Sequence, residues 1–278
     1  MYVEHLRIPI GLGAIHAERV GRGGPPVVLL HGFGTCAFLW RQLAPALAMA
    51  GYTAIAIDLL GHGESDQPDD AAYALDVQAD YLARALAALR LPAATLVGQD
   101  IGALVALLLV TTPGARVDSV VMLGPPDPDD LPGPEIRALQ RASARVVLQA
   151  NTLFGVQPIL APLLRAGVAD PAHMPDLLVA RYLAPFVGPD GLRQLLQRAS
   201  AVEISPTARA RLADVAVPVL VLEGDGDTPR PSLSWPTVLP AAAVAVRRLA
   251  GVGRLVPEDA PDTLRDLLLE WLVAQRNR

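Results

Sequence analysis

The chain has 278 residues, 52% of them hydrophobic and 18% charged, and a formal net charge of −5 at pH 7. That length buries one substantial core, so we predict one core domain with an insertion. Acidic and basic residues are interspersed without a basic patch, which argues against a nucleic-acid partner. The single cysteine, Cys36, leaves no internal disulfide and favours a reducing, cytoplasmic compartment.

The N-terminal 20 residues predict two strands, 3–10 and 12–20. Short, continuous apolar runs follow, separated by helical patterns, as expected for strands that are buried on both faces of a parallel sheet. The runs cover residues 27–30, 53–57, 94–97, 117–123, 217–222 and, more weakly, 243–249. This alternation predicts an α/β fold with a mostly parallel, doubly wound sheet.

The alternation breaks after residue 123. Residues 124–134 are rich in proline and aspartate, and helical patterns without strands continue to about residue 211. Frequent prolines in this region favour several short helices. We therefore predict a core of residues 1–128 and 210–278 with an inserted helical cap of residues 129–209.

The sequence was searched for an export signal and for a membrane-spanning segment. The first residues have neither a basic leader nor a small-residue cleavage site, so we expect no export signal. The longest apolar run, 101–110, is about half of the roughly 20 residues that a membrane span needs. We expect no membrane partner.

The most informative motif is Gly98-Gln99-Asp100-Ile101-Gly102, between a predicted strand and an apolar helix. A tight strand-to-helix turn flanked by small residues lifts the central side chain clear of the sheet. An isolated match would more often be an ordinary helix-capping aspartate. Here four further motifs accompany it in order, at residues 31–34, 58–65, 219–227 and 249–261.

Together, these five motifs resemble the α/β-hydrolase superfamily, in the branch with an aspartate nucleophile that includes epoxide hydrolases and haloalkane dehalogenases. The resemblance implies that Asp100 is the nucleophile and that the amides of Phe33 and Ile101 form an oxyanion hole. It also implies Asp227 as the catalytic acid, with Asp225 as the nearby competitor. Arg254 stands at the position of the family's histidine.

Arginine at that position changes the expected chemistry. An aspartate in a strand-to-helix turn of this kind, the nucleophile elbow, can displace a leaving group from an sp³ carbon and form an alkyl ester. Hydrolysis of that ester needs a base, and a guanidinium stays protonated. His31 and His62 lie in glycine-rich turns and are interpreted as structural, and His173 is the remaining histidine to test.

We predict an epoxide-hydrolase-like enzyme that acts on a small apolar molecule without cofactor or metal. Two alternatives remain open. One is a non-hydrolytic enzyme in which Asp100 is a base for elimination, isomerisation or cyclisation. The other is a ligand-binding protein in which Asp227 and Arg254 form a structural ion pair.

The aromatic residues assigned to substrate contact are Trp40, Tyr182 and Phe186, with core packing as the alternative for each. In the family, dehalogenases typically carry tryptophan after the nucleophile, whereas this chain has Ile101. Epoxide hydrolases usually direct two cap tyrosines at the epoxide oxygen, and the predicted cap offers only Tyr182. Dehalogenation is therefore disfavoured, and epoxide opening is supported in part.

Overall fold

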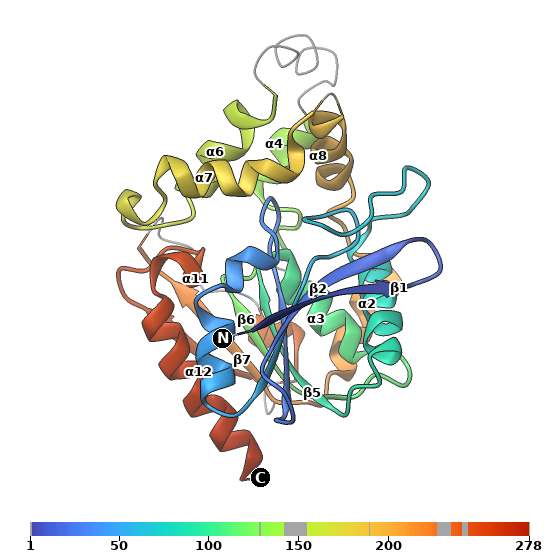
Figure 1. Cartoon of the computed structure of the whole chain (residues 1–278), viewed down its shortest axis with the longest axis vertical. Coiled ribbons are helices and arrows are strands. Elements are labelled where there is room, and N and C mark those ends of the chain that lie inside the picture. The colour runs from blue at the N-terminus through green and yellow to red at the C-terminus, as the bar shows by residue number, and fades with distance from the viewer. Residues whose placement is uncertain are drawn as a thin grey trace.

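A central sheet is the framework of the computed structural model, which describes residues 2–127, 129–141, 155–188, 190–226, 235–240 and 244–277 (Figure 1). Within these ranges the sheet has eight strands in the order β1-β2-β4-β3-β5-β6-β7-β8. Pairing is antiparallel for β1 with β2 and for β2 with β4, and parallel for the others. The strands are β1 (Val3–Pro9), β2 (Ala14–Val20), β3 (Pro26–Leu30), β4 (Thr53–Ile57), β5 (Ala94–Gln99), β6 (Val117–Leu123), β7 (Val219–Gly224) and β8 (Val244–Leu249).

The apolar runs of the sequence form the parallel strands because helices cover both faces of the sheet. Every residue of β3 and β4 is buried, and their alternate side chains enter two separate apolar clusters. The helix α3 (Ile101–Val110) packs with α2 (Leu75–Ala88) in one cluster. The helices α1 (Leu43–Met49) and α12 (Pro261–Arg276) pack in the other. The predicted α/β sheet is thus confirmed.

Between β6 and β7 the described chain is helical. It contains α4 (Pro134–Arg141), α6 (Gln157–Arg165), α7 (Asp176–Leu183), α8 (Gly191–Ser200) and α9 (Pro206–Arg211), with short 3₁₀ turns at Pro171–His173, Ala184–Phe186 and Leu212–Asp214. We call these the inserted helices. Figure 1 shows α4, α6, α7 and α8 gathered beyond one end of the sheet. The exact limits of the cap, 129 and 209, stay a prediction.

Three further short elements complete the described chain: the 3₁₀ turn η1 (Ala37–Trp40), α10 (Trp235–Val238) and α11 (Val256–Asp259). Among the helices of the described ranges, none is both long enough and apolar enough to span a bilayer.

The loop after β4 is organised by the buried carboxylate of Asp58. Its oxygens accept hydrogen bonds from the Ala37 amide at 2.6 Å, the Glu64 amide at 2.9 Å and His16 Nδ1 at 2.8 Å. Burial by itself would raise the pKa of Asp58, but the hydrogen bonds from His16 and the two amides lower it overall. Asp58 therefore joins β2, η1 and its own loop as an ionised acceptor.

Gly63 in this loop provides a test of that packing. It has a φ of +53°, and a Cβ there would lie 2.2 Å from the Asp58 carboxyl group, whereas Gly23 has a φ of +84° and open space around its Cβ position. Gly23→Ala should cost about 1 kcal/mol of unfolding free energy through backbone strain, and Gly63→Ala about 1–3 kcal/mol more through the clash. Equilibrium urea unfolding measures both, and equal losses would contradict this role of the Asp58 carboxylate.

Candidate active site

Asp100 lies in a sharp turn between β5 and α3, with a φ of +52° and a ψ of −121°. A Cβ on Gly98 would lie 2.4 Å from the Ala103 nitrogen, and one on Gly102 would lie 2.4 Å from the His31 carbonyl oxygen. Only glycine fits at either position without moving the backbone. The glycines therefore allow the turn that the sequence motif predicts, and Asp100 adopts a backbone conformation that non-glycine residues seldom occupy.

The loop after β3 holds one oxygen of the Asp100 carboxylate. The Phe33 amide donates a hydrogen bond to Asp100 Oδ2 at 3.0 Å. A Cβ on Gly32 would come within 2.9 Å of Asp100 Cβ, so a glycine there permits this close approach. Ile101 is the first residue of α3, which puts its amide at the N-terminal end of that helix. Phe33 and Ile101 thus both adjoin Asp100, although a hydrogen bond to its carboxylate is observed for Phe33 alone within the described contacts.

Asp100 lines a cavity of about 440 Å³ between the carboxyl end of the sheet and the inserted helices. The lining combines apolar side chains from α6, such as Leu160 and Leu164, with several charged groups. The charged residues that line it are Asp100, Asp127, Asp130, Glu135 and Arg254. A pocket of this size, mostly apolar with a few convergent polar groups, suits a small organic molecule.

Arg254 lines the cavity, and its guanidinium binds the inserted helices. Its Nη1 donates to Glu135 Oε1 at 2.9 Å, and its Nη2 donates to the Leu163 carbonyl at 3.2 Å. The Arg254 carbonyl accepts a hydrogen bond from Gln99 Nε2 at 2.8 Å, next to Asp100. Arg254 therefore connects the elbow, the last loop of the core and the inserted helices.

The predicted acid is not placed by the structure. Asp227 lies outside the described residues, and so does its predicted pairing with Arg254. The competitor Asp225 is exposed and accepts a hydrogen bond from the Gly251 amide at 2.7 Å. Asp225 thus has a role in the turn that precedes Arg254, and it is not among the described residues that line the cavity.

Three carboxylates of the cavity were missed from the sequence: Asp127, Asp130 and Glu135. A signal was present for Asp127 and Asp130, which lie in the segment after the buried strand β6, whereas Glu135 lies in the first turn of α4. Ligand sites in parallel sheets lie at the carboxyl ends of strands. The proline- and aspartate-rich segment 124–134 was interpreted only as the entry to the cap, so its acidic residues were given no place in the site.

His31 and His62 support loops on the core side of the site. His31 Nδ1 donates to the Gly32 carbonyl at 2.8 Å, and its Nε2 accepts from the Leu59 amide at 3.1 Å. Burial lowers the pKa of His31, and burial together with the nearby Arg198 guanidinium lowers the pKa of His62 to about 3. Both rings are therefore neutral, and their positions agree with the structural interpretation.

His173 binds a different carboxylate. Its Nδ1 lies 2.6 Å from Asp259 Oδ1, and the Asp259 carboxylate also accepts hydrogen bonds from the Gly253 amide at 2.6 Å and the Ala169 amide at 2.9 Å. His173 is not among the described residues that line the Asp100 cavity. Asp259 instead fastens the loop that carries Arg254 to the inserted helices.

Trp40, Tyr182 and Phe186 are not among the described residues that line the cavity, so their predicted contact with substrate has no counterpart there. All three are buried in the same apolar cluster, and Trp40 is 0% exposed. The Tyr182 hydroxyl donates to the Glu258 carboxylate, which also forms two hydrogen bonds with Arg41. The physical reason is that these large rings pack between core and inserted helices, which was the alternative left open for them.

Comparison with known proteins agrees with this geometry. A family model described as the alpha/beta hydrolase fold matches residues 25–155. A haloalkane dehalogenase of Mycobacterium marinum is 30% identical over 269 residues, which cover 89% of this chain and 84% of the relative. The chain belongs to the α/β-hydrolase superfamily.

Two further similarities refine the position of this α/β hydrolase. The bifunctional epoxide hydrolase 2 of Mus musculus is 34% identical over 130 residues, which cover 45% of this chain and 23% of the relative. The crystal structure of Cfl2 from Burkholderia cenocepacia is 27% identical with a TM-score of 0.84, covering 96% of this chain and 95% of that one. The chain falls in the superfamily branch that contains haloalkane dehalogenases and epoxide hydrolases.

The contact between His173 and Asp259 predicts a pH-dependent stability of this α/β hydrolase. The hydrogen bond with Asp259 raises the pKa of His173, whereas hydrogen bonds lower the pKa of Asp259 despite its burial. A raised histidine pKa stabilises the fold fully below the ordinary value of about 6.5, and this contribution is lost as the pH rises through the folded-state value. The unfolding free energy of the wild type should therefore exceed that of His173→Ala most at about pH 5.5 and least at about pH 9.

Urea unfolding of both proteins across this range measures the difference. Subtracting the two curves removes the contribution of other histidines, His16 included, whose pKa is also raised overall because the hydrogen bond and charge of Asp58 outweigh its burial. A difference in unfolding free energy that stays constant with pH would show that protonation of His173 does not strengthen its contact with Asp259.

Proposed function

We propose that this α/β hydrolase opens a small, largely apolar epoxide with Asp100 as the nucleophile. The observation that carries the proposal is the Asp100 carboxylate, which accepts a hydrogen bond from the Phe33 amide and lines a cavity of about 440 Å³. The relatives named as epoxide hydrolase and haloalkane dehalogenase support a displacement of this kind. Both names describe enzymes that act at an sp³ carbon, which suits a carboxylate nucleophile.

In the proposed first step, Asp100 Oδ1 attacks an epoxide carbon. A new C–O bond forms an alkyl ester with the enzyme and the epoxide C–O bond breaks. The substrate oxygen stays bonded to the other carbon as an alkoxide and takes a proton from water, which leaves hydroxide. Asp100 Oδ2 becomes the ester carbonyl oxygen and keeps its hydrogen bond from the Phe33 amide, joined by the Ile101 amide when charge develops there. Arg254, which lines the same cavity, stabilises the alkoxide electrostatically.

The second step, hydrolysis of the ester, is proposed to be slow. It requires a base that takes a proton from the attacking water, and Arg254 stays protonated. Among the described cavity residues, the available bases are the carboxylates of Asp127, Asp130 and Glu135. A carboxylate is ordinarily a much weaker base than imidazole, and the Glu135 carboxylate already accepts a hydrogen bond from the Arg254 guanidinium.

The charges of the cavity favour an epoxide over an alkyl halide. Displacement of a halide releases an anion into a cavity that three additional carboxylates line, and like charges repel. Ile101, beside Asp100, offers a halide no side-chain N–H donor. An epoxide oxygen stays bonded to the substrate, and the hydroxide formed when it takes a proton from water is neutralised by the proton that ester hydrolysis releases. The complete reaction therefore releases no anion.

The contacts of Arg254 also favour a second candidate. Because Glu135 and the Leu163 carbonyl bind its guanidinium, Arg254 is compatible with a retained pocket that no longer hydrolyses an ester. In that case the protein is a non-hydrolytic enzyme with Asp100 as a general base, or a ligand-binding protein. Elimination or isomerisation gives products without added water, and ligand binding gives no product, so product analysis separates these alternatives from epoxide hydrolysis.

The first prediction concerns the covalent ester. Incubation with a panel of terminal epoxides should increase the intact mass of the protein by the mass of one epoxide, and peptide mapping should place the addition on Asp100. Asp100→Asn should abolish the adduct, while Asp80→Asn, an exposed aspartate on α2, should leave it unchanged. Failure to detect either an adduct or a diol with any epoxide would refute the proposed displacement.

The second prediction concerns the missing base. Arg254→His should accelerate loss of the ester by at least about tenfold. General base catalysis ordinarily contributes roughly 10²–10⁴-fold, and an unrefined histidine can fall short of that range. Arg254→Lys, which keeps a cation and supplies no comparable base, is the matched control and should not accelerate it. The measurement is the decay of the adduct mass after removal of free epoxide. Equal decay in both variants would show that the base alone does not limit hydrolysis.

A further inference from the structure

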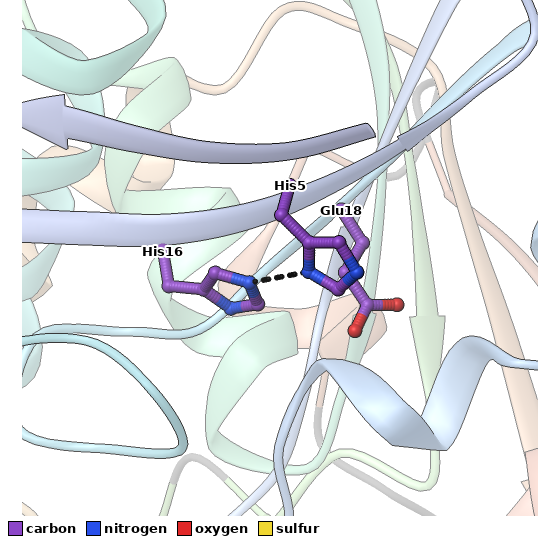
Figure 2. Close-up of side chains that lie close together, drawn as sticks. All are labelled: His5, His16 and Glu18. Atoms are coloured by element: carbon purple, nitrogen blue, oxygen red, sulfur yellow. Dashed lines mark hydrogen bonds between the residues drawn. The ribbon is translucent and has the colours of Figure 1, made fainter. Parts of the chain in front are cut away.

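The N-terminal hairpin carries a cluster of metal-ligating side chains outside the Asp100 cavity. His5 lies on β1, and His16 and Glu18 lie on β2. The antiparallel register pairs His5 with Glu18, and His16 is two residues from Glu18 on the same strand. Side chains two apart on a strand share a face, so all three project from one side of the hairpin, as Figure 2 shows.

The spacing of the two imidazoles matches that of ligands on one metal ion. His5 Nδ1 lies 3.2 Å from His16 Nε2, the contact drawn in Figure 2. Two nitrogens bound to Zn²⁺ at about 2.0–2.1 Å with tetrahedral angles lie about 3.3–3.4 Å apart. Ligand atoms of all three residues lie within 4.8 Å of one another, so small side-chain rotations suffice to bring them to one ion.

Asp58 orients His16 for such a role. His16 Nδ1 lies 2.8 Å from Asp58 Oδ2, and His16 and Asp58 are only 3% and 2% exposed. A carboxylate that accepts from one ring nitrogen directs the lone pair of the other nitrogen to a metal, and this support is typical of histidine ligands. His16 Nε2 is thereby turned toward His5 and Glu18. The exposed ring of His5 has the freedom to adjust.

We propose that His5, His16 and Glu18 bind one divalent transition-metal ion of the Zn²⁺ class. Two imidazoles and a carboxylate suit borderline metals such as Zn²⁺ better than Mg²⁺, which prefers oxygen ligands. Glu64 Oε2 lies 3.8 Å from His16 Nε2, so the exposed Glu64 carboxylate or a water completes the four ligands that Zn²⁺ takes.

The bound ion has a structural role in this proposal. It joins β1 to β2 through His5 and His16, and through His16 and Asp58 it joins the hairpin to the loop of residues 58–65. None of the three ligands is among the described lining of the Asp100 cavity. Metal binding and reaction at Asp100 are therefore separate properties, and failure of one proposal leaves the other standing.

Zn²⁺ titration of the metal-free full chain tests the site. Isothermal calorimetry with a competing chelator should give about one ion per chain. The melting temperature should rise by about 5–10 °C when free Zn²⁺ is about 100 times Kd, and Mg²⁺ should have no such effect. His5→Ala and Glu18→Gln should each weaken Zn²⁺ binding at least about 100-fold, more than loss of a supporting hydrogen-bond partner typically does.

Two controls make the result decisive. His173→Ala removes another histidine bound to a carboxylate and should retain full Zn²⁺ affinity, and Glu64→Gln reports whether Glu64 or water is the fourth ligand. His16 is buried, so His5→Ala and Glu18→Gln carry the test without the risk of misfolding. Absence of Zn²⁺ binding, or binding that neither variant weakens, would overturn the proposal.

Discussion

The backbone conformation of Asp100 is the constraint on which the rest of the site depends. A residue other than glycine at a φ of +52° and a ψ of −121° is strained by about 1–3 kcal/mol. This conformation is maintained because the surrounding backbone fixes the turn. Gly98, Gly102 and Gly32 allow the backbones of β5, α3 and the loop after β3 to meet around it. Their convergence brings the Phe33 amide within hydrogen-bond distance of the Asp100 carboxylate.

A second set of contacts, centred on Arg254, joins the core to the inserted helices beside the cavity. Arg254 binds Glu135 and the Leu163 carbonyl of the inserted helices, while its own carbonyl receives Gln99 beside the elbow. Asp259 fastens the same loop through the Gly253 and Ala169 amides. The sequence motifs predict that Arg254 stands at the position of the family's histidine, which the resemblance assigns to proton transfer. Here the guanidinium holds core and inserted helices together, and this difference underlies the slow hydrolysis that we propose.

Asp58 and Asp259 have parallel roles. Each is a buried carboxylate that accepts hydrogen bonds from backbone amides, two for Asp58 and three for Asp259, and from one histidine. These hydrogen bonds keep the pKa of each low despite burial. Asp58 receives His16 from the hairpin and Asp259 receives His173 from the inserted helices. Both histidines thereby tie a peripheral segment to the core, and within the described ranges His16 has two further metal-ligating side chains close to it, His5 and Glu18.

The sequence by itself determined the sheet, the elbow and the family. Continuous apolar runs such as 53–57 have one stable solution, a strand buried on both faces, and the glycines around Asp100 report a local backbone requirement that does not depend on distant contacts. Only the tertiary structure decided what surrounds Asp100. Glu135 reaches Arg254 across 119 residues, Tyr182 binds Glu258 instead of lining the cavity, and His5 meets His16 through strand pairing. Such contacts depend on how separate elements pack against one another, and local sequence patterns do not determine that packing.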